Sequence, residues 1–140
     1  MSALFQEVYP VESRSFDTAG DASGRIKRIL NKMGISSAVV REVAIASYEL
    51  ELNLVIHSLG GQLKLEMTGE SLRLTSTDRG PGIPDIDLAL QEGYSTASED
   101  VRNMGFGAGM GLPNIKRHSH EFHIQSKAGE GTTIQCIYHL

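Results

Sequence analysis

The sequence predicts an α+β fold, a two-layer α/β sandwich in which a mixed, mostly antiparallel sheet carries helices on one face. The first observation behind this prediction is the order of hydrophobic patterns: strand, two helices, hairpin, short helix, helix, hairpin. Strands and helices are partly segregated along the chain, which favours helices on one face of a sheet. The second observation is size, because 140 residues without a linker, repeat or low-complexity tract predict one domain over residues 1–140.

Composition narrows the class of protein. No apolar stretch reaches the about 18 residues of a membrane span, and residues 1–10 lack the basic and apolar segments of a secretory signal. Cys136 is the only cysteine, so neither an internal disulfide nor a cysteine-based metal site can form, which fits a reducing cytoplasm. A formal net charge of −4 without a basic run argues against nucleic acid as the main partner.

The N-terminal part predicts one strand and one helix. A strand is expected between residues 4 and 16, with Tyr9-Pro10 marking a break. Asp21 can cap a helix that continues to Met33, and Gly34 is expected to stop it. The apolar positions of this helix are Ile26, Ile29 and Leu30.

A second, longer helix follows. Ser36 or Ser37 can cap it, and Gly60 and Gly61 are expected to end it. It runs through residues that recur at three- and four-residue spacing, namely Val40, Val43, Ala44, Ser47, Leu50 and Leu54.

Two hairpins and two helices make up the rest. The first hairpin alternates from Leu63 to Leu74 around Thr68-Gly69-Glu70, and the closing hairpin runs from Phe122 to Ile137 around residues 128–131. The segments between them are expected to be a loop at 78–85, a short helix at 85–91, an irregular stretch at 93–111 and a helix at 112–118.

Polar residues on the long helix form the first candidate site. Glu49, Asn53 and His57 are four residues apart and share one stripe of a largely apolar helix. An unpaired buried polar group costs about 1–3 kcal/mol, so such residues need polar partners. A magnesium-bound nucleotide with an ordered water would provide them: Asn53 can offer its carbonyl oxygen to a hard cation, and Glu49 can take a proton from water or a hydroxyl. The alternative explanation is an exposed helix face.

The second candidate is the loop Asp78-Arg79-Gly80-Pro81-Gly82-Ile83-Pro84, which follows an expected strand. Gly80 and Gly82 allow a tight path and close backbone approach to a flat ligand. Asp78 at the strand end can accept a hydrogen bond from an exocyclic amine such as that of adenine. An ordinary turn is the alternative, because Asp, Gly and Pro all favour turns.

The third candidate is a run of alternate glycines before Leu112 and Pro113, namely Gly105, Gly107, Gly109 and Gly111. The run exposes backbone N–H groups and leads into a helix whose N-terminus favours phosphate. A flexible loop is the simpler alternative. A Rossmann motif would need Gly-x-Gly-x-x-Gly after an early strand, and a P-loop would need Gly-Lys-Ser/Thr, which the sequence lacks.

Together these motifs resemble the GHKL ATPase superfamily, which includes gyrase, histidine-kinase catalytic domains and bacterial anti-sigma-factor kinases. The resemblance covers about residues 36–138 and rests on Glu49-x-x-x-Asn53, Asp78-x-Gly80-x-Gly82, Gly107-x-Gly109-x-Gly111-Leu112 and Gly129-x-Gly131-Thr132. Within it, the sequence is most similar to small serine/threonine kinases of bacterial partner switching. The segments that carry this likeness are 78–85, 92–96, 114–117 and Glu121-Phe122, whereas the lid at 97–104 is longer than in those kinases.

The resemblance implies the Bergerat ATP-binding fold, with ATP and Mg²⁺ as cofactors. It implies that Asn53 binds magnesium, Glu49 is the base and Asp78 recognises adenine. The other implied nucleotide-binding residues are Gly80, Gly82, Ile83, Gly105, Gly107, Gly109, Gly111, Leu112 and, beside Asp78, Thr132. His57 matches a polar position of some relatives or is a packing histidine at the helix end. Arg102 could meet the terminal phosphate or be a solvated lid charge.

Two function classes follow from the resemblance. The first is a protein serine/threonine kinase that phosphorylates a small antagonist or switch protein. The second is a non-catalytic switch in which nucleotide sets the shape of the lid, and the lid binds or releases a partner such as a sigma factor. A homodimer is compatible with either class, and neither a membrane nor nucleic acid is an expected partner.

Overall fold

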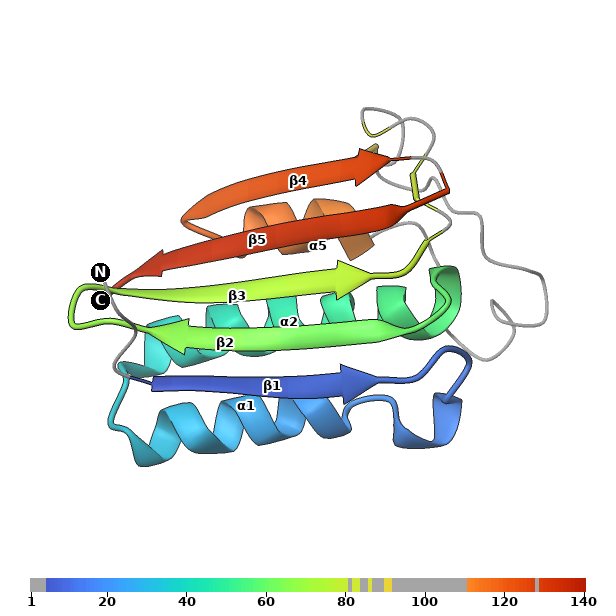
Figure 1. The fold of residues 1–140 in the computed structure, drawn as a ribbon. Helices are drawn as coiled ribbons and strands as arrows, with labels where there is room; N and C mark the ends of the chain where they lie inside the picture. The colour runs from blue at the N-terminus through green and yellow to red at the C-terminus, as the bar shows by residue number, and fades with distance from the viewer. Residues whose placement is uncertain (1–4, 81, 84–85, 87–89, 92–110, 128) are drawn as a thin grey trace.

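The computed structural model describes residues 5–80, 82–83, 86, 90–91, 111–127 and 129–140, without the side chain of His57. Its centre is a five-stranded sheet in the order β1-β2-β3-β5-β4 (Figure 1). All four pairings are antiparallel, so the described strands include no parallel pair of a mixed sheet. The strands are β1 (Phe5–Val11), β2 (Gly61–Met67), β3 (Ser71–Asp78), β4 (Glu121–Lys127) and β5 (Gly131–His139).

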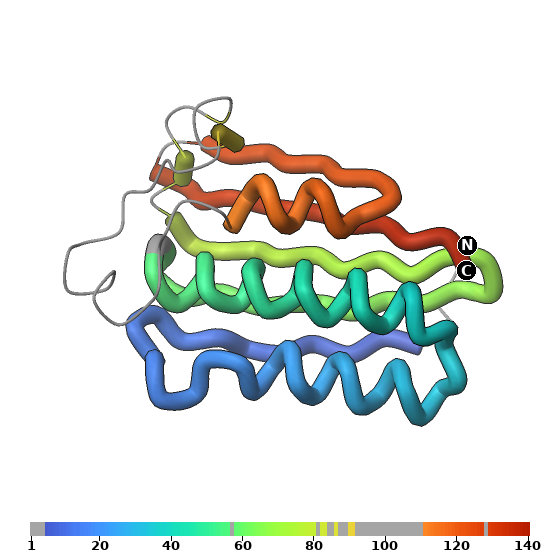
Figure 2. Tube along the Cα trace, turned by 180° about the vertical axis from the view of Figure 1, so that it is seen from behind, coloured from blue at the N-terminus to red at the C-terminus, as the bar shows by residue number. Residues whose placement is uncertain are grey.

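Helices cover one face of this sheet, which confirms the predicted two-layer architecture. Seen from behind, they lie in front of the strands, with α2 between α1 and α5 (Figure 2). The helices are α1 (Asp21–Lys32), α2 (Ser37–His57) and α5 (Gly111–Arg117), and a short 3-10 turn, η1 (Phe16–Thr18), precedes α1. No helix within the described ranges has the length and apolar character needed to cross a membrane.

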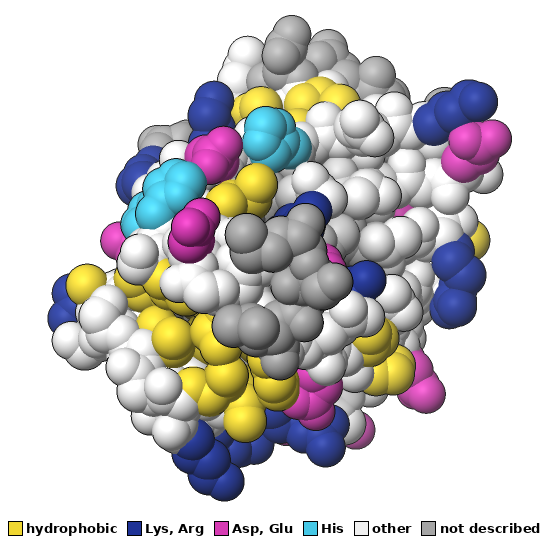
Figure 3. Space-filling model, turned by 60° about the vertical axis from the view of Figure 1, so that its left-hand side comes forward, with side chains coloured by type: hydrophobic (Ala, Val, Ile, Leu, Met, Phe, Trp, Pro, Cys, Tyr) yellow, Lys and Arg dark blue, Asp and Glu magenta, His cyan; other side chains and the backbone are white. Residues whose placement is uncertain are grey.

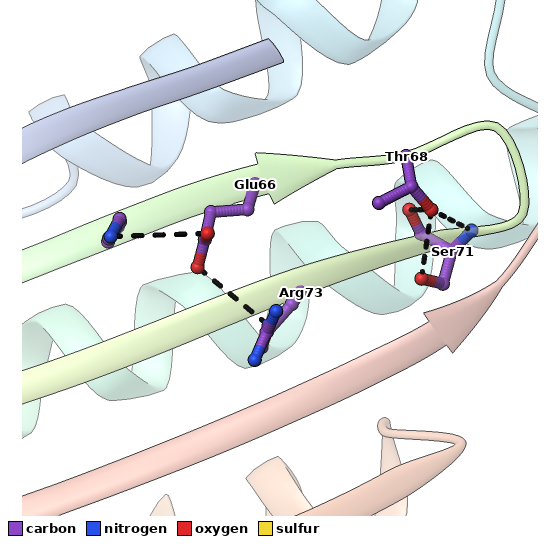
Figure 4. Close-up of polar contacts among 5 residues, drawn as sticks. Glu66, Thr68, Ser71 and Arg73 are labelled. Carbon is purple, nitrogen blue, oxygen red and sulfur yellow. Dashed lines mark hydrogen bonds and ion pairs between the residues drawn. The ribbon is translucent and has the colours of Figure 1, made fainter. Parts of the chain in front are cut away.

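Alternation in the predicted hairpins sets the register of the sheet. Leu65 of β2 pairs with Leu74 of β3, and Leu74 pairs with Cys136 of β5, which puts all three side chains on the helix-covered face. The opposite face carries charge: Glu66 lies 3.7 Å from Arg73 and 4.0 Å from Lys64 (Figure 4). A one-residue slip would exchange these two faces, so burial fixes the pairing.

The core lies between the two layers. Fully buried side chains include Leu50 and Leu54 of α2, Ile26 of α1, Ile115 of α5 and Tyr138 of β5. The helices α1, α2 and α5 and the strands β2, β3 and β5 therefore turn apolar side chains to this layer, and the cluster extends from Tyr9 to Tyr138.

Two predictions for the N-terminal part are wrong. Tyr9-Pro10 does not break the strand, because β1 is an edge strand and proline needs no inward hydrogen bond there. Asp21 does not cap α1 either. Gly20 occupies the cap position with φ 102°, and Glu51 of α2 accepts hydrogen bonds from the first-turn amides instead.

Other element predictions are confirmed. Ser36 caps α2, its Oγ accepting from the Val39 amide at 3.4 Å, and Gly34 ends α1 with φ 74°. The helix expected at 85–91 falls mostly outside the described residues, although the Leu90 N–H donates to the Ile86 carbonyl as in one α-helical turn.

Candidate functional site

Four elements meet at one edge of the molecule. The C-terminal end of α2, the end of β3, the start of β5 and the start of α5 all lie at this edge in Figures 1 and 2. The residues of the predicted motifs are at these ends. The fold therefore gathers motifs that are far apart in the sequence.

Glu49 and Asn53 face the start of α5. A Cβ atom placed on Gly111 would lie 3.2 Å from Asn53 Oδ1 and 3.4 Å from Glu49 Oε2. A side chain at position 111 would therefore crowd Asn53 Oδ1 and lie in contact with Glu49 Oε2. Glu49 and Asn53 of the predicted stripe therefore lie together with the last glycine of the Gly run, and both side chains are half-buried rather than on an exposed helix face.

Burial changes the acidity of Glu49. Removal from water raises the pKa of its carboxyl above the ordinary value, and a hydrogen bond from Asn114 opposes part of that rise. Asn114 Oδ1 accepts from Arg117 Nη1 at 3.0 Å, which turns the Asn114 amide group toward Glu49. Asn114 therefore lies within hydrogen-bonding reach of Glu49, a contact that the sequence analysis did not assign.

Asp78 organises the other half of the site. Its Oδ1 accepts hydrogen bonds from the Gly80 and Thr132 amides, both at 2.9 Å. These bonds join the end of β3 to the start of β5, and among the residues that the structure describes no hydrogen-bond partner is found for Oδ2. Thr132 therefore lies beside Asp78, as predicted.

The contact between Asp78 and the start of β5 requires glycine at position 131. A Cβ there would come within 2.3 Å of the Asp78 carbonyl oxygen and 2.8 Å of Asp78 Oδ1, and φ is 130°. Gly80 and Gly82 also have positive φ, at 119° and 89°. Only glycine adopts such a path without strain, so the loop glycines shape the surroundings of Asp78.

Ser126 connects the loop to the sheet. Its Oγ accepts from the Ile83 amide at 2.6 Å and lies 2.8 Å from Thr132 Oγ1. Ser126 is a second residue that the sequence analysis missed, because a lone serine on a strand carries no sequence signal.

The end of α2 is tied to the Asp78 loop. The Leu59 N–H donates to the Gly80 carbonyl at 3.0 Å, and the Arg79 N–H donates to the Gly60 carbonyl at 3.2 Å. Arg79 Nη2 also donates to the Leu59 carbonyl at 3.1 Å. The halves that contain Asn53 and Asp78 are therefore held in a fixed relation.

Several predicted residues lie outside this geometry. Leu112 is half-buried and packs against the core rather than standing free. Within the described ranges, no three His, Cys, Asp or Glu side chains cluster as a metal site. Gly105, Gly107, Gly109 and Arg102 fall outside the described residues, as does the side chain of His57.

Comparison with known proteins places the chain in a family. The family model described as histidine kinase-, DNA gyrase B- and HSP90-like ATPase matches residues 38–140. The serine/threonine-protein kinase RsbT of Bacillus subtilis is 33% identical over 115 residues, covering 79% of this chain and 80% of RsbT. The anti-sigma F factor of Anoxybacillus flavithermus is 31% identical over 109 residues, covering 78% of this chain and 67% of that protein.

The fold also has a solved counterpart. A chain of the SiaB–SiaC complex from Pseudomonas aeruginosa superposes with a TM-score of 0.62, covering 97% of this chain and 89% of its own length. Only 13% of residues are identical, so this likeness concerns the fold.

Proposed function

Because the chain belongs to the histidine kinase-, DNA gyrase B- and HSP90-like ATPase family, we propose that it is an ATP-dependent protein kinase that phosphorylates a serine or threonine of a small partner protein. The relative RsbT carries the name of such a kinase, and other relatives are named anti-sigma F factors. The observation that carries the proposal is the pair Glu49 and Asn53 beside Gly111.

Each half of the site has a part in this proposal. Asp78 would accept a hydrogen bond from the adenine amine through Oδ2, while Oδ1 keeps the loop in place. Asn53 would hold a magnesium ion through Oδ1 together with the nucleotide phosphates, and such an ion neutralises phosphate charge. Glycine at position 111 fits that arrangement, because a Cβ atom there would lie 3.2 Å from the Asn53 Oδ1 that would hold the ion.

Glu49 would act as the base. A carboxylate whose pKa is raised by burial accepts a proton from a hydroxyl more readily than an exposed one. Asn114 would keep the carboxylate oriented while the proton moves. The sequestering of a sigma factor by a nucleotide-dependent, non-catalytic switch is the alternative, and it needs no base.

An assay of phosphate transfer distinguishes the protein kinase from the non-catalytic switch. The purified protein is incubated with γ-labelled ATP and host lysate, and labelled protein is analysed for phosphoserine and phosphothreonine. We expect a labelled protein that disappears with Glu49→Gln but remains with Glu70→Gln, a matched change at an exposed turn. ATP affinity should be the same for all three proteins. ATP binding without any labelled protein would contradict the kinase and favour the switch.

A further inference from the structure

The acidic residues of α2 all have roles inside the protein. Glu42 Oε2 lies 2.8 Å from His118 Nδ1 at the end of α5. Glu49 faces the start of α5, and Glu51 caps α1. Arg41 is the only other charged residue of the helix, so the side of α2 that faces away from the sheet has almost no charge.

That outer side carries an apolar stripe. Ala44 and Ile45 are three and four residues after Arg41, and they are four and three residues before Tyr48, so the four residues share a face. Tyr48 is 39% exposed, and Ala44 and Ile45 are half-buried. The outer face of a surface helix is normally polar, so this stripe is unusual for a helix without a partner.

A groove runs along the stripe between α1 and α2. Its volume is about 360 Å³, at the lower end of the range for binding pockets. Val40, Ala44 and Ile45 give it an apolar floor, while Lys27 of α1 and Arg41 of α2 line it with positive charge. Asn31 adds a polar group from α1. The groove is on the outer side of the helix layer, whereas Asp78 lies at an end of the sheet.

The charge around the groove differs from that of the whole chain. Helix α1 contains Arg25, Lys27, Arg28 and Lys32 against the single acidic Asp21, although the chain carries a net charge of −4. On the side of the molecule shown in Figure 3, by contrast, basic and acidic side chains are interspersed.

The basic residues of the groove have no acidic partner within the described part of the chain. Among the residues described by the structure, neither Lys27 nor Arg41 has an ion-pair partner. The basic residues of the sheet differ in this respect, because Lys64 and Arg73 share Glu66 (Figure 4) and Lys127 lies 3.6 Å from Glu130. Charge that the fold does not balance is available to a binding partner of opposite sign.

We propose that the groove between α1 and α2 is a docking site for an acidic segment of a partner protein. An apolar side chain of that segment would lie on Ala44 and Ile45, and its carboxylates would lie beside Lys27 and Arg41. The apolar floor favours a protein segment over the phosphate backbone of a nucleic acid, because the phosphate backbone has no apolar side chain to pack on it. The inference does not depend on phosphate transfer, because none of these residues belongs to the proposed nucleotide site.

A library of random linear peptides tests the inference. Peptides are selected on the wild-type protein and on the Lys27→Glu/Arg41→Glu variant. Lys116→Glu/Lys127→Glu serves as control, because it makes the same change in net charge at two exposed positions outside the groove. We expect peptides selected on the wild type to combine Asp or Glu with Leu, Ile or Phe. Their affinity should fall by about tenfold or more for the groove variant, remain for the control and weaken with added salt.

A third variant tests the apolar floor. Ile45→Ser keeps every charge, so it should weaken the selected peptides while nucleotide affinity, the measure of a folded protein, stays constant. Selections without an excess of acidic residues, or equal binding to the groove variant and the control, would overturn the proposal. Sedimentation gives another outcome against it: a wild-type dimer that only the groove variant dissociates would identify a second copy as the occupant.

Discussion

Asp78→Asn separates nucleotide recognition from folding at the proposed adenine site. The Oδ1 atom of Asp78 accepts the Gly80 and Thr132 amides, both at 2.9 Å. Asparagine keeps one carbonyl oxygen that can accept both bonds, so the loop should retain its shape. Its second atom becomes an NH₂ group, and the position that would meet the adenine amine changes from acceptor to donor.

The size of the effect follows from the bond that is lost. A hydrogen bond to a charged group contributes about 1.5–3 kcal/mol, and each 1.4 kcal/mol is a factor of about ten in affinity. The affinity for ATP and for ADP should therefore fall by about one to two orders of magnitude. Both nucleotides should lose the same factor, because adenine is common to them.

Calorimetry with ATP and ADP measures this loss, and circular dichroism confirms that the variant is folded. Asp17→Asn, an exposed position in η1, is the matched control and should bind as the wild type does. Asp78→Ala makes a useful contrast, because it leaves the Gly80 and Thr132 amides without their acceptor and should also lower stability. A folded Asp78→Asn protein with wild-type affinity would refute the assignment of Asp78 to adenine.

Three further predictions concern α2. Asn53→Ala should abolish the magnesium dependence of nucleotide affinity in calorimetry while ADP alone still binds; a surviving dependence would place the metal elsewhere. Glu51→Ala should lower the free energy of unfolding in urea by about 2–6 kcal/mol, because two buried amides lose their acceptor, whereas Asp21→Asn should change it little. As the pH is lowered, phosphate transfer should be lost at a higher pH than an ordinary carboxyl group would give, because the pKa of Glu49 is raised. Asn114→Ala should move that limit to still higher pH, and an unmoved limit would speak against this hydrogen bond.

Local sequence patterns were sufficient to predict most of the helices and strands. The alternation around Leu65 and Leu74 fixes which face of the hairpin is buried, and Ser36 caps α2 within its own sequence neighbourhood. Information of this kind lies within a few residues, so a single sequence contains it.

The predictions that were wrong concern features that depend on residues distant in the sequence. Pro10 fits within β1 only because that strand has one neighbour, and strand order is not visible in a local pattern. Glu51 replaces Asp21 as the cap of α1 because α2 packs against α1; it is 2% exposed and lies 28 residues from Ser23. A cap supplied by another helix has no sequence signature at the helix that it caps.

The candidate site shows the same division. Asp78 and Asn53 belong to motifs with recognisable spacing, whereas Asn114 and Ser126 gain their roles only when α5 meets α2 and β4 meets β5. Both are polar residues on amphipathic elements, where sequence alone would assign them to solvent. Asn114 follows Gly111 by three residues, which was the available signal, whereas Ser126 had none.

The proposed docking groove and the proposed base share one rigid helix. Ile45 and Glu49 are four residues apart on α2, which is about 6 Å along the axis and about 40° around it. An extended chain advances about 3.3 Å per residue, so a segment anchored on Ile45 would need only two or three residues to bring a hydroxyl over Glu49. Anchoring at this distance would position the hydroxyl without contacts to its immediate neighbours, because the helix itself fixes the separation. A partner would then be selected by its acidic anchor, and the base would need no specificity of its own.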